Sequence, residues 1–566
     1  MSAAQPLRIG NFSGFYGDRF SALAEMLADG ELDVLTGDFL AELTMLILAR
    51  DRQRDPNLGY ARTFLRQLEP CLGTALARGV RIVTNAGGLN PAGLATAIGE
   101  LAGRLGLAPR IGYVEGDDLS RTAARLGFGE PLAANAYLGG WGIAACLRAG
   151  ADIVVTGRVT DASLVVGPAA AHFDWSPTDY DALAGAVVAG HLIECGAQVT
   201  GGNYAFFSEL TDLRRLGFPI AELRPDGSSV ITKQAGTGGA VTVGTVTAQL
   251  LYEITGGRYA GPDVTARFDR LELSQDGPDR VSVRGAAGEP PPPRYKVSLN
   301  SLAGFRNEVQ FVLTGLEIER KAELVREQLA DVVPQAEWTL RRTDRPDADT
   351  EAAASAVLSC VVRGQDPELI GRRFSDAAVQ LALASYPGFH LTAPPGPAQP
   401  SGVFRGGYVD TAEVRQVAVL PDGSRQQIPA SPQHRELLEL PEPDVASWQA
   451  DTDRAGTRRV PLGELVGARS GDKGGSANLG LWVRSAAAYR WLVATLTVPR
   501  LRQLLPELAA LPIHRYLLPN LLAMNFVVDD LLGLGVAYAA RFDPQAKALG
   551  EWLRSRLVDV PVELLG

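Results

Sequence analysis

Cysteine and histidine are scarce in this sequence. Its 566 residues include five histidines and four cysteines, Cys71, Cys146, Cys195 and Cys360. The cysteines lie far apart without C-x-x-C spacing, so we interpret them as buried, small hydrophobic residues. The chain also lacks the H-E-x-x-H motif of helical zinc sites. No metal and no other cofactor is therefore predicted.

A surplus of basic residues and long apolar runs are also missing. The formal net charge is −10, which argues against a nucleic-acid or anionic-membrane partner because few free cations remain to neutralise phosphates. No segment approaches the roughly 20 apolar residues of a membrane span. The N-terminus has no basic run followed by an apolar run, so we expect no secretory signal. These features predict a reduced, cytoplasmic homo-oligomer that binds a small molecule, and an anionic substrate stays possible.

The length of the chain predicts several domains, because one hydrophobic core rarely extends over so many residues. We expect an α/β region over residues 1–225, which carries the site loops, and an α+β region over residues 226–440. A small α+β domain is expected over residues 457–566. The polar, proline-containing stretch 429–456 is the predicted boundary before it.

Three short apolar runs in the first region each end in a polar loop that contains glycine. They cover residues 83–91, 112–118 and 152–161, and helical patterns follow the first and precede the third. This alternation predicts a mainly parallel, doubly wound sheet, in which the loops collect at the carboxyl ends of the strands. Ligands of such sheets bind at that edge, so we expect the active site there.

Other stretches carry weaker patterns. Residues 134–149 are predicted as a helix, and residues 230–247 as strands because they are rich in glycine, threonine and valine. Residues 296–299 and 308–314 are predicted as two separate strands. Residues 468–478 are predicted as a loop, because glycine and polar residues dominate them.

The first strand of the chain ends in a glycine-rich turn. Asn11, Tyr16 and Asp18 lie at this turn and are candidate substrate-binding residues. The glycines at positions 14 and 17 do not form a G-x-G-x-x-G motif, so no dinucleotide site is indicated.

The turn over residues 84–91 is a candidate anion site. Its two glycines could let several backbone N–H groups point at one oxygen, and the following helix dipole would add to the attraction. Asn85, Gly87, Gly88 and Asn90 are therefore candidate binding residues, and Asn90 is also a predicted N-cap. The alternative is a tight turn that needs a positive φ.

Glu115, Asp117 and Asp118 place three carboxyl groups within four residues. They could hold Mg²⁺ through one or two oxygens, or one of them could be a base whose pKa is raised by like-charge repulsion. The alternative is a solvated acidic turn or a helix N-cap. Nothing in the segment resembles a complete cation site, so a metal is not predicted.

Arg158 and Asp161 follow the most apolar strand. The arginine could bind a substrate carboxylate bidentately, with the aspartate as its orienting partner or as an acid/base group. The alternative is an internal ion pair that braces two loops. Thr160 is a binding candidate without an adjacent histidine, so it is not an activated nucleophile.

His191 and Glu194 are three residues apart on a predicted helix. A proton-transfer or metal-binding pair is possible, but we favour a structural role because no H-E-x-x-H motif accompanies them. Asn203, in the loop that follows, is a further candidate for polar contacts with a substrate.

The segment over residues 469–478 is the second strong candidate site. Ser470, Asp472 and Lys473 stand among glycines, and the compact turn could hold a phosphate. It lacks Walker A spacing, and Lys473 could instead be a base or a Schiff-base amine if it is desolvated. The alternative is a hairpin-like turn with a surface lysine. We expect this segment to dock over the strand ends and complete the site.

Taken together, these loops resemble the acyclic terpene utilisation AtuA-like family. The segment after residue 457 is similar to the small AtuA-like ferredoxin-fold domain that is often fused to it. The sequence departs from the family's pattern at residues 533–535, where three glycines would be expected, and at residues 545–547, where a glycine should precede the lysine. The motifs that carry the resemblance cover residues 9–18, 84–91, 156–164, 470–474 and 518–526.

The resemblance implies catabolism of branched or terpenoid acids as CoA thioesters. Our first hypothesis is a lyase that hydrates, dehydrates or cleaves a carboxylated acyl-CoA. Its base would be Asp117, Asp118 or Asp161, Arg158 would bind the carboxylate, and the amides of residues 85–89 would stabilise a thioester enolate. The second hypothesis is a non-catalytic assembly or carrier subunit for an acyl-CoA carboxylase or hydratase. An amidohydrolase-like or kinase-like enzyme would need histidine clusters or a phosphate loop that this sequence lacks.

Overall fold

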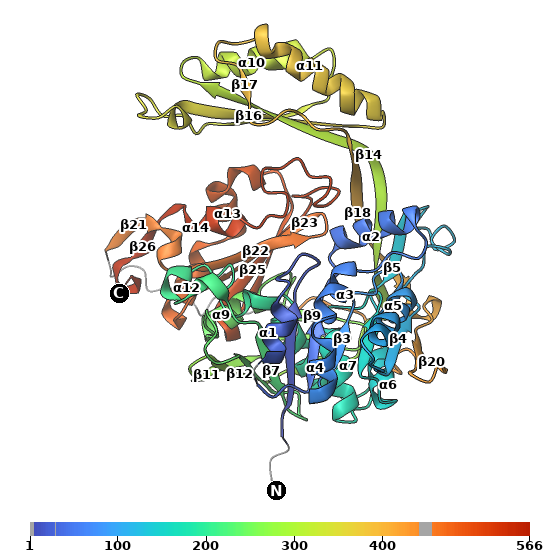
Figure 1. Ribbon diagram of the computed structural model, residues 1–566. Helices are drawn as coiled ribbons and strands as arrows, with labels where there is room; N and C mark the ends of the chain where they lie inside the picture. Colours follow the sequence, from blue (N-terminus) through green and yellow to red (C-terminus); the bar gives the residue numbers. More distant parts are fainter. Residues whose placement is uncertain (1–4, 29, 441–455, 566) are drawn as a thin grey trace. The chain divides into compact units, whose positions relative to one another are not determined.

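The structure is a computed structural model that describes residues 5–28, 30–440 and 456–565 (Figure 1). The chain divides into two compact units. The larger comprises Met1–Asn300, Phe404–Val536 and Gln545–Gly566, and the smaller comprises Ser301–Val403 and Ala537–Pro544. In the part of the chain that is described, no helix combines the length and the apolar character that a membrane crossing requires.

An eleven-stranded sheet forms the centre of the larger unit, counted over the described residues. Its five central strands are parallel, and antiparallel strands continue the sheet on both sides. The predicted α/β class is confirmed, but the sheet is mixed, and parallel pairing is confined to its centre. The central strands are, in order, β1 (Leu7–Ser13), β2 (Val34–Gly37), β3 (Arg81–Thr84), β6 (Ile153–Thr156) and β4 (Ile111–Glu115). The flanking strands are β7 (Pro219–Leu223), β8 (Ser229–Lys233), β12 (Arg280–Arg284), β11 (Glu272–Gly277), β19 (Val417–Val419) and β20 (Arg425–Gln427).

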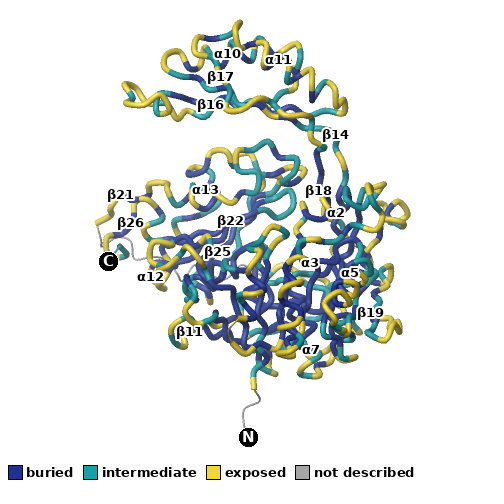
Figure 2. The backbone as a smooth tube through the Cα atoms, in the orientation of Figure 1, coloured by how far each residue is buried: buried dark blue, intermediate teal, exposed yellow. Residues whose placement is uncertain are grey.

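Alternate side chains of the central strands enter two hydrophobic clusters, because successive residues of a strand point to opposite faces. In β3, Ile82 belongs to one cluster and Val83 to the other. The strands are therefore apolar on both faces, as buried parallel strands are, and Figure 2 shows them as buried backbone. The first cluster contains residues of α1 (Ala22–Ala28), α3 (Arg62–Leu68), α4 (Leu72–Arg78) and α5 (Pro91–Arg104). The second contains residues of α6 (Trp141–Arg148), α7 (Ser163–His172) and α8 (Tyr180–Ile193).

The small domain near the C-terminus has a four-stranded antiparallel sheet in the order β22-β23-β25-β24. The predicted loop over residues 468–478 is wrong: it is a hairpin in which Gly471 pairs with Asn478 and Lys473 pairs with Ser476. Gly474 has a φ of +65° and turns the chain. Of the glycines that suggested a loop, Gly471 lies in a strand where the backbone closely approaches Tyr252, whereas Gly474 and Gly475 lie in the turn. The elements are β22 (Gly467–Lys473), β23 (Ser476–Trp482), β24 (Ile513–Leu518), β25 (Ala523–Val528), α12 (Ala486–Thr495), α13 (Val498–Leu504) and α14 (Leu549–Arg554).

Both faces of this small sheet are buried. Leu479 and Phe526 pack with the helices of the domain itself. Trp482 on the other face belongs to the core of the large sheet region, together with Leu251, which follows helix α9 (Val243–Leu250). The small domain is therefore part of the larger unit, with α9 and the residues after it as its partner surface.

The smaller unit is an antiparallel sheet with helices α10 and α11 on its apolar face. Phe311 and Leu358 face each other across two of its strands and belong to its core. The strands are β15 (Glu337–Arg341), β16 (Ser355–Gly364), β17 (His390–Leu391) and the later part of β14 (Arg294–Thr314), and the helices are α10 (Ile318–Leu329) and α11 (Phe374–Gln380).

Three predicted elements differ from the structure. The two strands predicted at 296–299 and 308–314 are one continuous strand, β14. The predicted strands over residues 230–247 are β8 followed by helix α9, which begins because the Thr242 hydroxyl accepts the Thr245 N–H. The predicted helix over residues 134–149 begins as strand β5 (Ala133–Ala136) before α6. Elements not yet named are α2 (Glu42–Arg54), β9 (Arg258–Ala260), β10 (Thr265–Arg267), β13 (Ala287–Glu289), β18 (Gln399–Asp410), β21 (Thr457–Pro461) and β26 (Leu557–Pro561).

Gly480 tests the close packing of β23 on the segment after α9. A Cβ atom at Gly480 would lie 2.5 Å from the Leu251 Cβ, so one backbone has to move. We expect Gly480→Ala to lower the free energy of unfolding by about 1–3 kcal/mol, measured by chemical denaturation. Gly73, where an added Cβ meets only one atom at 3.9 Å, provides the control variant Gly73→Ala, which should not be destabilised. Equal stability of both variants would contradict the packing described here.

Candidate active site

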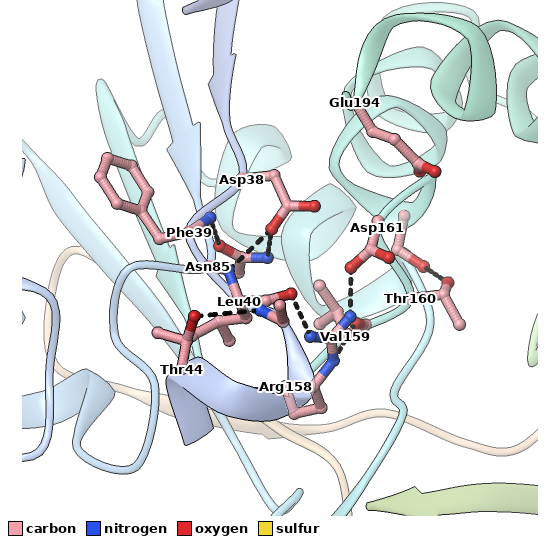
Figure 3. A network of polar contacts seen from close by, with 12 residues as sticks. Asp38, Phe39, Leu40, Thr44, Asn85, Arg158, Val159, Thr160, Asp161 and Glu194 are labelled. Carbon is pink, nitrogen blue, oxygen red and sulfur yellow. Dashed lines mark hydrogen bonds and ion pairs between the residues drawn. The ribbon is translucent and has the colours of Figure 1, made fainter. Parts of the chain in front are cut away.

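Polar side chains meet where the parallel strands end. Asn11 lies near the carboxyl end of β1, Asp38 follows β2, Asn85 follows β3 and Arg158 follows β6, and all four are buried. The Asn85 Oδ1 accepts the Phe39 N–H at 2.8 Å, and its Nδ2 donates to the Asp38 Oδ1 at 2.6 Å (Figure 3). The structure thus brings together residues that the sequence placed on three separate loops.

Arg158 is 2% exposed and is surrounded by partners from its own protein. Its Nε donates to the Val159 carbonyl at 3.0 Å and its Nη1 to the Leu40 carbonyl at 2.7 Å. Its Nη2 forms an ion pair with Asp161, and its guanidinium carbon lies 4.4 Å from the centre of the Tyr137 ring. All three nitrogens are therefore engaged. This geometry supports the alternative of an ion pair that braces the loops after β2 and β6.

The turn over residues 84–91 uses its backbone within the protein. Gly88 has a φ of +53°, as the tight-turn alternative requires. The Gly88 N–H donates to the Asn85 carbonyl at 3.0 Å and the Asn90 N–H to the Gly87 carbonyl at 2.8 Å. The Asn90 side chain accepts the Gly93 N–H at 2.9 Å, which confirms the predicted N-cap of α5. These bonds support a structural role, in which the turn positions Asn85.

The three acidic residues after β4 are separated by the fold. The Glu115 carboxylate pairs with Arg425 at 2.6 Å, and the Asp118 carboxylate pairs with Arg52 at 3.1 Å. Asp117 alone is buried, at 3% exposure. The three carboxyl groups therefore do not form one site.

The Asp117 carboxyl group contacts the Arg158 backbone. Its Oδ2 accepts the Arg158 N–H at 2.9 Å and the Asn135 Nδ2–H at 2.8 Å. Burial raises the pKa of Asp117 to about 7, and the charge of Asp118 adds to the rise. One alternative from the sequence was a base in this acidic segment with a raised pKa, and the pKa of Asp117 is raised. Desolvation is the main cause of the rise, however, and like-charge repulsion is secondary.

The carboxyl groups of Asp38, Asp161 and Glu194 lie near one another and near Arg158 (Figure 3). Burial, followed by the charge of Asp161, raises the pKa of both Asp38 and Glu194 well above the ordinary range. Burial therefore favours the protonated form of both carboxyl groups. The Glu194 Oε2 is buried and has no hydrogen-bond partner among the described residues. Within those residues, no group of three or more His, Cys, Asp or Glu side chains is arranged to hold a metal ion.

His191 contacts Glu194 on helix α8. The His191 Nδ1 lies 3.3 Å from the Glu194 Oε1, and its Nε2 lies 3.4 Å from the Leu250 carbonyl oxygen. Burial lowers the pKa of His191 to about 4, so the ring is neutral. With Nε2–H donating to Leu250, the Nδ1 is free to accept the proton of Glu194. The fold thus brings the His191 and Glu194 side chains into contact, as their spacing on one helix predicts.

Lys473 enters the same region from the small domain. Its Nζ donates to the Glu253 carbonyl at 2.9 Å. Burial and the charge of Lys296 lower the pKa of Lys473 to about 8, although Glu253 and Glu42 act in the opposite direction. The segment predicted to dock on the large region does so, and the desolvated-amine alternative fits better than a surface lysine.

The neighbours of Lys473 on β22 have structural partners. The Ser470 hydroxyl donates to the Lys547 carbonyl at 3.2 Å and accepts the Gly550 N–H at 2.9 Å. The Asp472 carboxylate pairs with the Lys547 ammonium at 3.2 Å. Burial and the charge of Glu253 raise the pKa of Asp472. Ser470 therefore holds α14, and Asp472 forms the rim of the site.

The remaining predicted residues lie at the edge of the site or outside it. The Asn11 Nδ2 approaches the Glu194 carbonyl at 3.5 Å. Asp18 closes its own turn by accepting the Gly14 N–H at 2.8 Å. Thr160 shares a hydrogen bond with the Ser163 hydroxyl. Tyr16 packs beside the hydrophobic cluster that contains α1, and Asn203 is exposed in a left-handed turn with a φ of +58°.

The residues that we had not predicted come from segments far apart in sequence. Lys296 on β14 lies 4.7 Å from the centre of the Tyr137 ring. Glu253 is a non-glycine residue with a φ of +58°. Burial raises the pKa of Glu42, and its charge acts on Lys473 and Arg158. One signal was present: the chain has only five lysines, and three of them, Lys296, Lys473 and Lys547, lie in this region.

Two family models match the chain. The model described as "Acyclic terpene utilisation family protein AtuA" matches residues 7–420. The model described as "AtuA ferredoxin-like domain" matches residues 460–559. No curated protein and no solved structure matches the chain. The two matched segments correspond to the regions that contribute the strand-end residues and Lys473.

Asp117 makes stability depend on pH. The folded protein keeps the Asp117 proton up to about pH 7, whereas an unfolded aspartate loses it near pH 4. Because the folded state binds more protons between these values, its stability falls as the pH rises through them, by about 1.4 kcal/mol per pH unit. Asp117→Asn keeps an acceptor for both hydrogen bonds and removes the titration. We expect it to raise the midpoint of urea denaturation at about pH 8 and to change it little at about pH 4.

The comparison of the two pH values separates titration from a general packing effect. An equal change in the denaturation midpoint at both values would contradict the buried, protonated Asp117. Asp118→Asn is the matched control, because Asp118 is paired with Arg52 and its side chain is 35% exposed.

Proposed function

Because the chain belongs to the acyclic terpene utilisation family AtuA, we propose that it is an enzyme of branched or terpenoid acyl-CoA catabolism. We assign it as a lyase that hydrates, dehydrates or cleaves a carboxylated acyl-CoA. The observation that carries the assignment is one backbone segment shared by the two groups: the Glu253 carbonyl accepts the Nζ–H of Lys473, whose pKa is about 8, and the Leu250 carbonyl lies 3.4 Å from the Nε2 of His191, which contacts Glu194.

A lyase of this kind needs a base for the proton next to the thioester carbonyl and an acid for the leaving group. Lys473 suits the base, because a pKa of about 8 leaves part of the amine unprotonated near neutral pH. Glu194 suits the acid, because burial favours its protonated form and its Oε2 has no hydrogen-bond partner among the described residues. His191 accepts or returns that proton at its Nδ1.

The substrate carboxylate needs a cation that the protein has not already paired. Arg158 is engaged by Leu40, Val159 and Asp161, so we assign this role to Lys296. The residue is exposed, and within the described part of the chain its ammonium has no hydrogen bond or ion pair. The ammonium lies over the Tyr137 ring, and the charge of Glu42 acts on it. A desolvated carboxylate beside an ammonium and an aromatic face is a favourable arrangement.

The alternative of a non-catalytic subunit does not account for the protonation states. Burial of Asp38, Glu194 and Lys473 disfavours their charged forms and costs stability, and such perturbed groups concentrate at functional sites. An assembly or carrier subunit has no use for buried ionisable groups with such shifted pKa values. We therefore keep the enzyme as the proposal.

Replacement of the proposed base tests the function. We expect Lys473→Met to lower kcat/KM for methylglutaconyl-CoA or isohexenylglutaconyl-CoA by about 10²- to 10⁴-fold, since general base catalysis contributes that much. Glu194→Gln, which keeps the shape but cannot release a proton, should show a loss of the same order. The wild-type kcat/KM should rise with pH to a plateau above about 8, as Lys473 loses its proton.

Lys321 provides a matched control, because it also donates to a carbonyl, that of Thr314 at 2.7 Å, but lies on α10 in the smaller unit. Lys321→Met should turn over both CoA esters at the wild-type rate. Wild-type turnover by Lys473→Met would end the assignment of the base.

Replacement of Lys296 tests the carboxylate site. We expect Lys296→Met to raise KM by roughly 10- to 100-fold, the value of a hydrogen bond between charged groups. Because Lys296 also lowers the pKa of Lys473, the measurement belongs above about pH 9, where Lys473 is unprotonated in both proteins. Lys296→Arg, which keeps the charge, should retain most of the affinity. An unchanged KM for Lys296→Met would reject this role.

A further inference from the structure

One short segment of backbone contacts both the proposed base and the proposed acid pair. The Leu250 carbonyl lies 3.4 Å from the His191 Nε2, and the Glu253 carbonyl accepts the Lys473 Nζ–H at 2.9 Å. Between them the chain leaves helix α9 and adopts a left-handed conformation at Glu253, with a φ of +58°. The path of residues 250–255 therefore determines where His191 and Lys473 stand relative to each other.

Asn478 of the small domain holds the first half of this segment. Its Nδ2 donates to the Leu251 carbonyl at 2.9 Å, and its Oδ1 accepts the Glu253 N–H at 2.8 Å. The remaining Nδ2–H donates to the Asn525 Oδ1 at 2.6 Å. Asn478 is fully buried. It thus fixes the peptide on each side of residue 252, including the left-handed residue.

Asn525 holds the second half. Its Nδ2 donates to the Ile254 carbonyl at 2.9 Å and to the Thr255 carbonyl at 2.7 Å. Asn525 is also fully buried, and its Oδ1 is occupied by Asn478. Both amide groups therefore have a partner for each N–H and for the oxygen. Such complete pairing of buried polar groups specifies one arrangement, because any shift leaves a donor or acceptor unpaired at a cost of about 1–3 kcal/mol.

Two glycines of the β22–β23 hairpin, which carries Asn478, permit this close approach. A Cβ at Gly480 would lie 2.5 Å from Leu251, and a Cβ at Gly471 would lie 2.5 Å from the Tyr252 ring. Glycine at both positions lets the small sheet reach the segment closely enough for amide hydrogen bonds. A purely apolar interface would bury the same surface without fixing the carbonyl directions.

We propose that Asn478 and Asn525 are positioning residues, which couple docking of the small domain to the placement of Lys473 and of the His191–Glu194 pair. This inference rests on the proposed function for its catalytic meaning. Through Glu253, Asn478 holds the residue whose carbonyl binds Lys473, and through Leu251 it holds the end of α9 that orients His191. Asn525 supports the same segment at Ile254 and Thr255 and binds Asn478 itself. Neither asparagine touches the substrate in this account.

The coupling has a consequence for the titration of Lys473. The charged groups that act on its ammonium are Lys296 from β14, Glu253 from the held segment and Glu42 from α2. Desolvation is the largest cause of its lowered pKa. If the segment loosens, water reaches the amine, and its pKa returns toward the ordinary value near 10.5.

The experiment compares Asn478→Ala and Asn525→Ala with Asn520→Ala in the full-length protein. Asn520 is a matched control, because it also donates two hydrogen bonds across the same interface, at 2.9 Å each to the Phe268 and Leu271 carbonyls, without touching residues 250–255. The readout is acetylation of Lys473 by acetic anhydride as a function of pH, followed by peptide mass spectrometry. Turnover of the CoA esters is measured in parallel.

We expect half-maximal reactivity of Lys473 near pH 8 in the wild type and in Asn520→Ala. In Asn478→Ala and Asn525→Ala the midpoint should rise by about one pH unit or more, with a loss of about tenfold or more in kcat/KM at neutral pH. Midpoints that coincide in all four proteins would overturn the proposal. A raised midpoint in the two variants supports the coupling even if the wild type turns over neither ester, and that result would count against the proposed function alone.

Discussion

Desolvation of ionisable groups at the strand ends is the constraint on which the rest of the site depends. Burial is the largest cause of the raised pKa of Asp38 and Glu194 and of the lowered pKa of His191 and Lys473. In water the two carboxyl groups would be ionised near neutral pH, and the amine would keep its proton to a much higher pH. Burial thus shifts the two acids toward their protonated forms and the amine toward its neutral form, and shifts of this kind favour acid–base catalysis.

Two parts of the fold, the parallel sheet with its helices and the small sheet, produce this desolvation in different ways. The parallel strands and their helices bury apolar side chains on both faces and leave polar groups only at the carboxyl ends. The small sheet then packs on the segment after α9 with the face that carries Asn478 and Asn525. Burial of apolar side chains stabilises the fold, whereas the paired side-chain amides of Asn478 and Asn525 fix how the two surfaces are oriented at their interface.

The sequence predicted that polar residues gather at the strand ends, but it did not predict the contacts that these residues make. Apolar runs that end in glycine-bearing loops located β3, β4 and β6, because strand ends have that local pattern. Asn90 was predicted as a cap because its role depends only on the next three residues. The role of Arg158 depends on the Leu40 carbonyl, which is 118 residues away in sequence, and no local pattern reveals such a partner.

Other residues escaped prediction for the same reason. Lys296, Glu253 and Asp38 reach the site through tertiary packing, so neither periodicity nor spacing identifies them. The hairpin at residues 468–478 was predicted as a loop, because glycines that permit close packing of strands are the same residues that mark turns. The scarcity of lysine was the available signal, since a residue type that is rare elsewhere and gathers in one place suggests a function.

The most direct test of the account is the titration of Lys473 in the intact protein. The chain has five lysines, so ¹³C-NMR of protein labelled at the lysine ε-carbons gives few signals, and Lys473→Arg assigns the relevant one. The account predicts a titration midpoint at about pH 8 for Lys473. A midpoint near the ordinary value of about 10.5 would show that the small domain does not desolvate this amine, and would contradict the central claim.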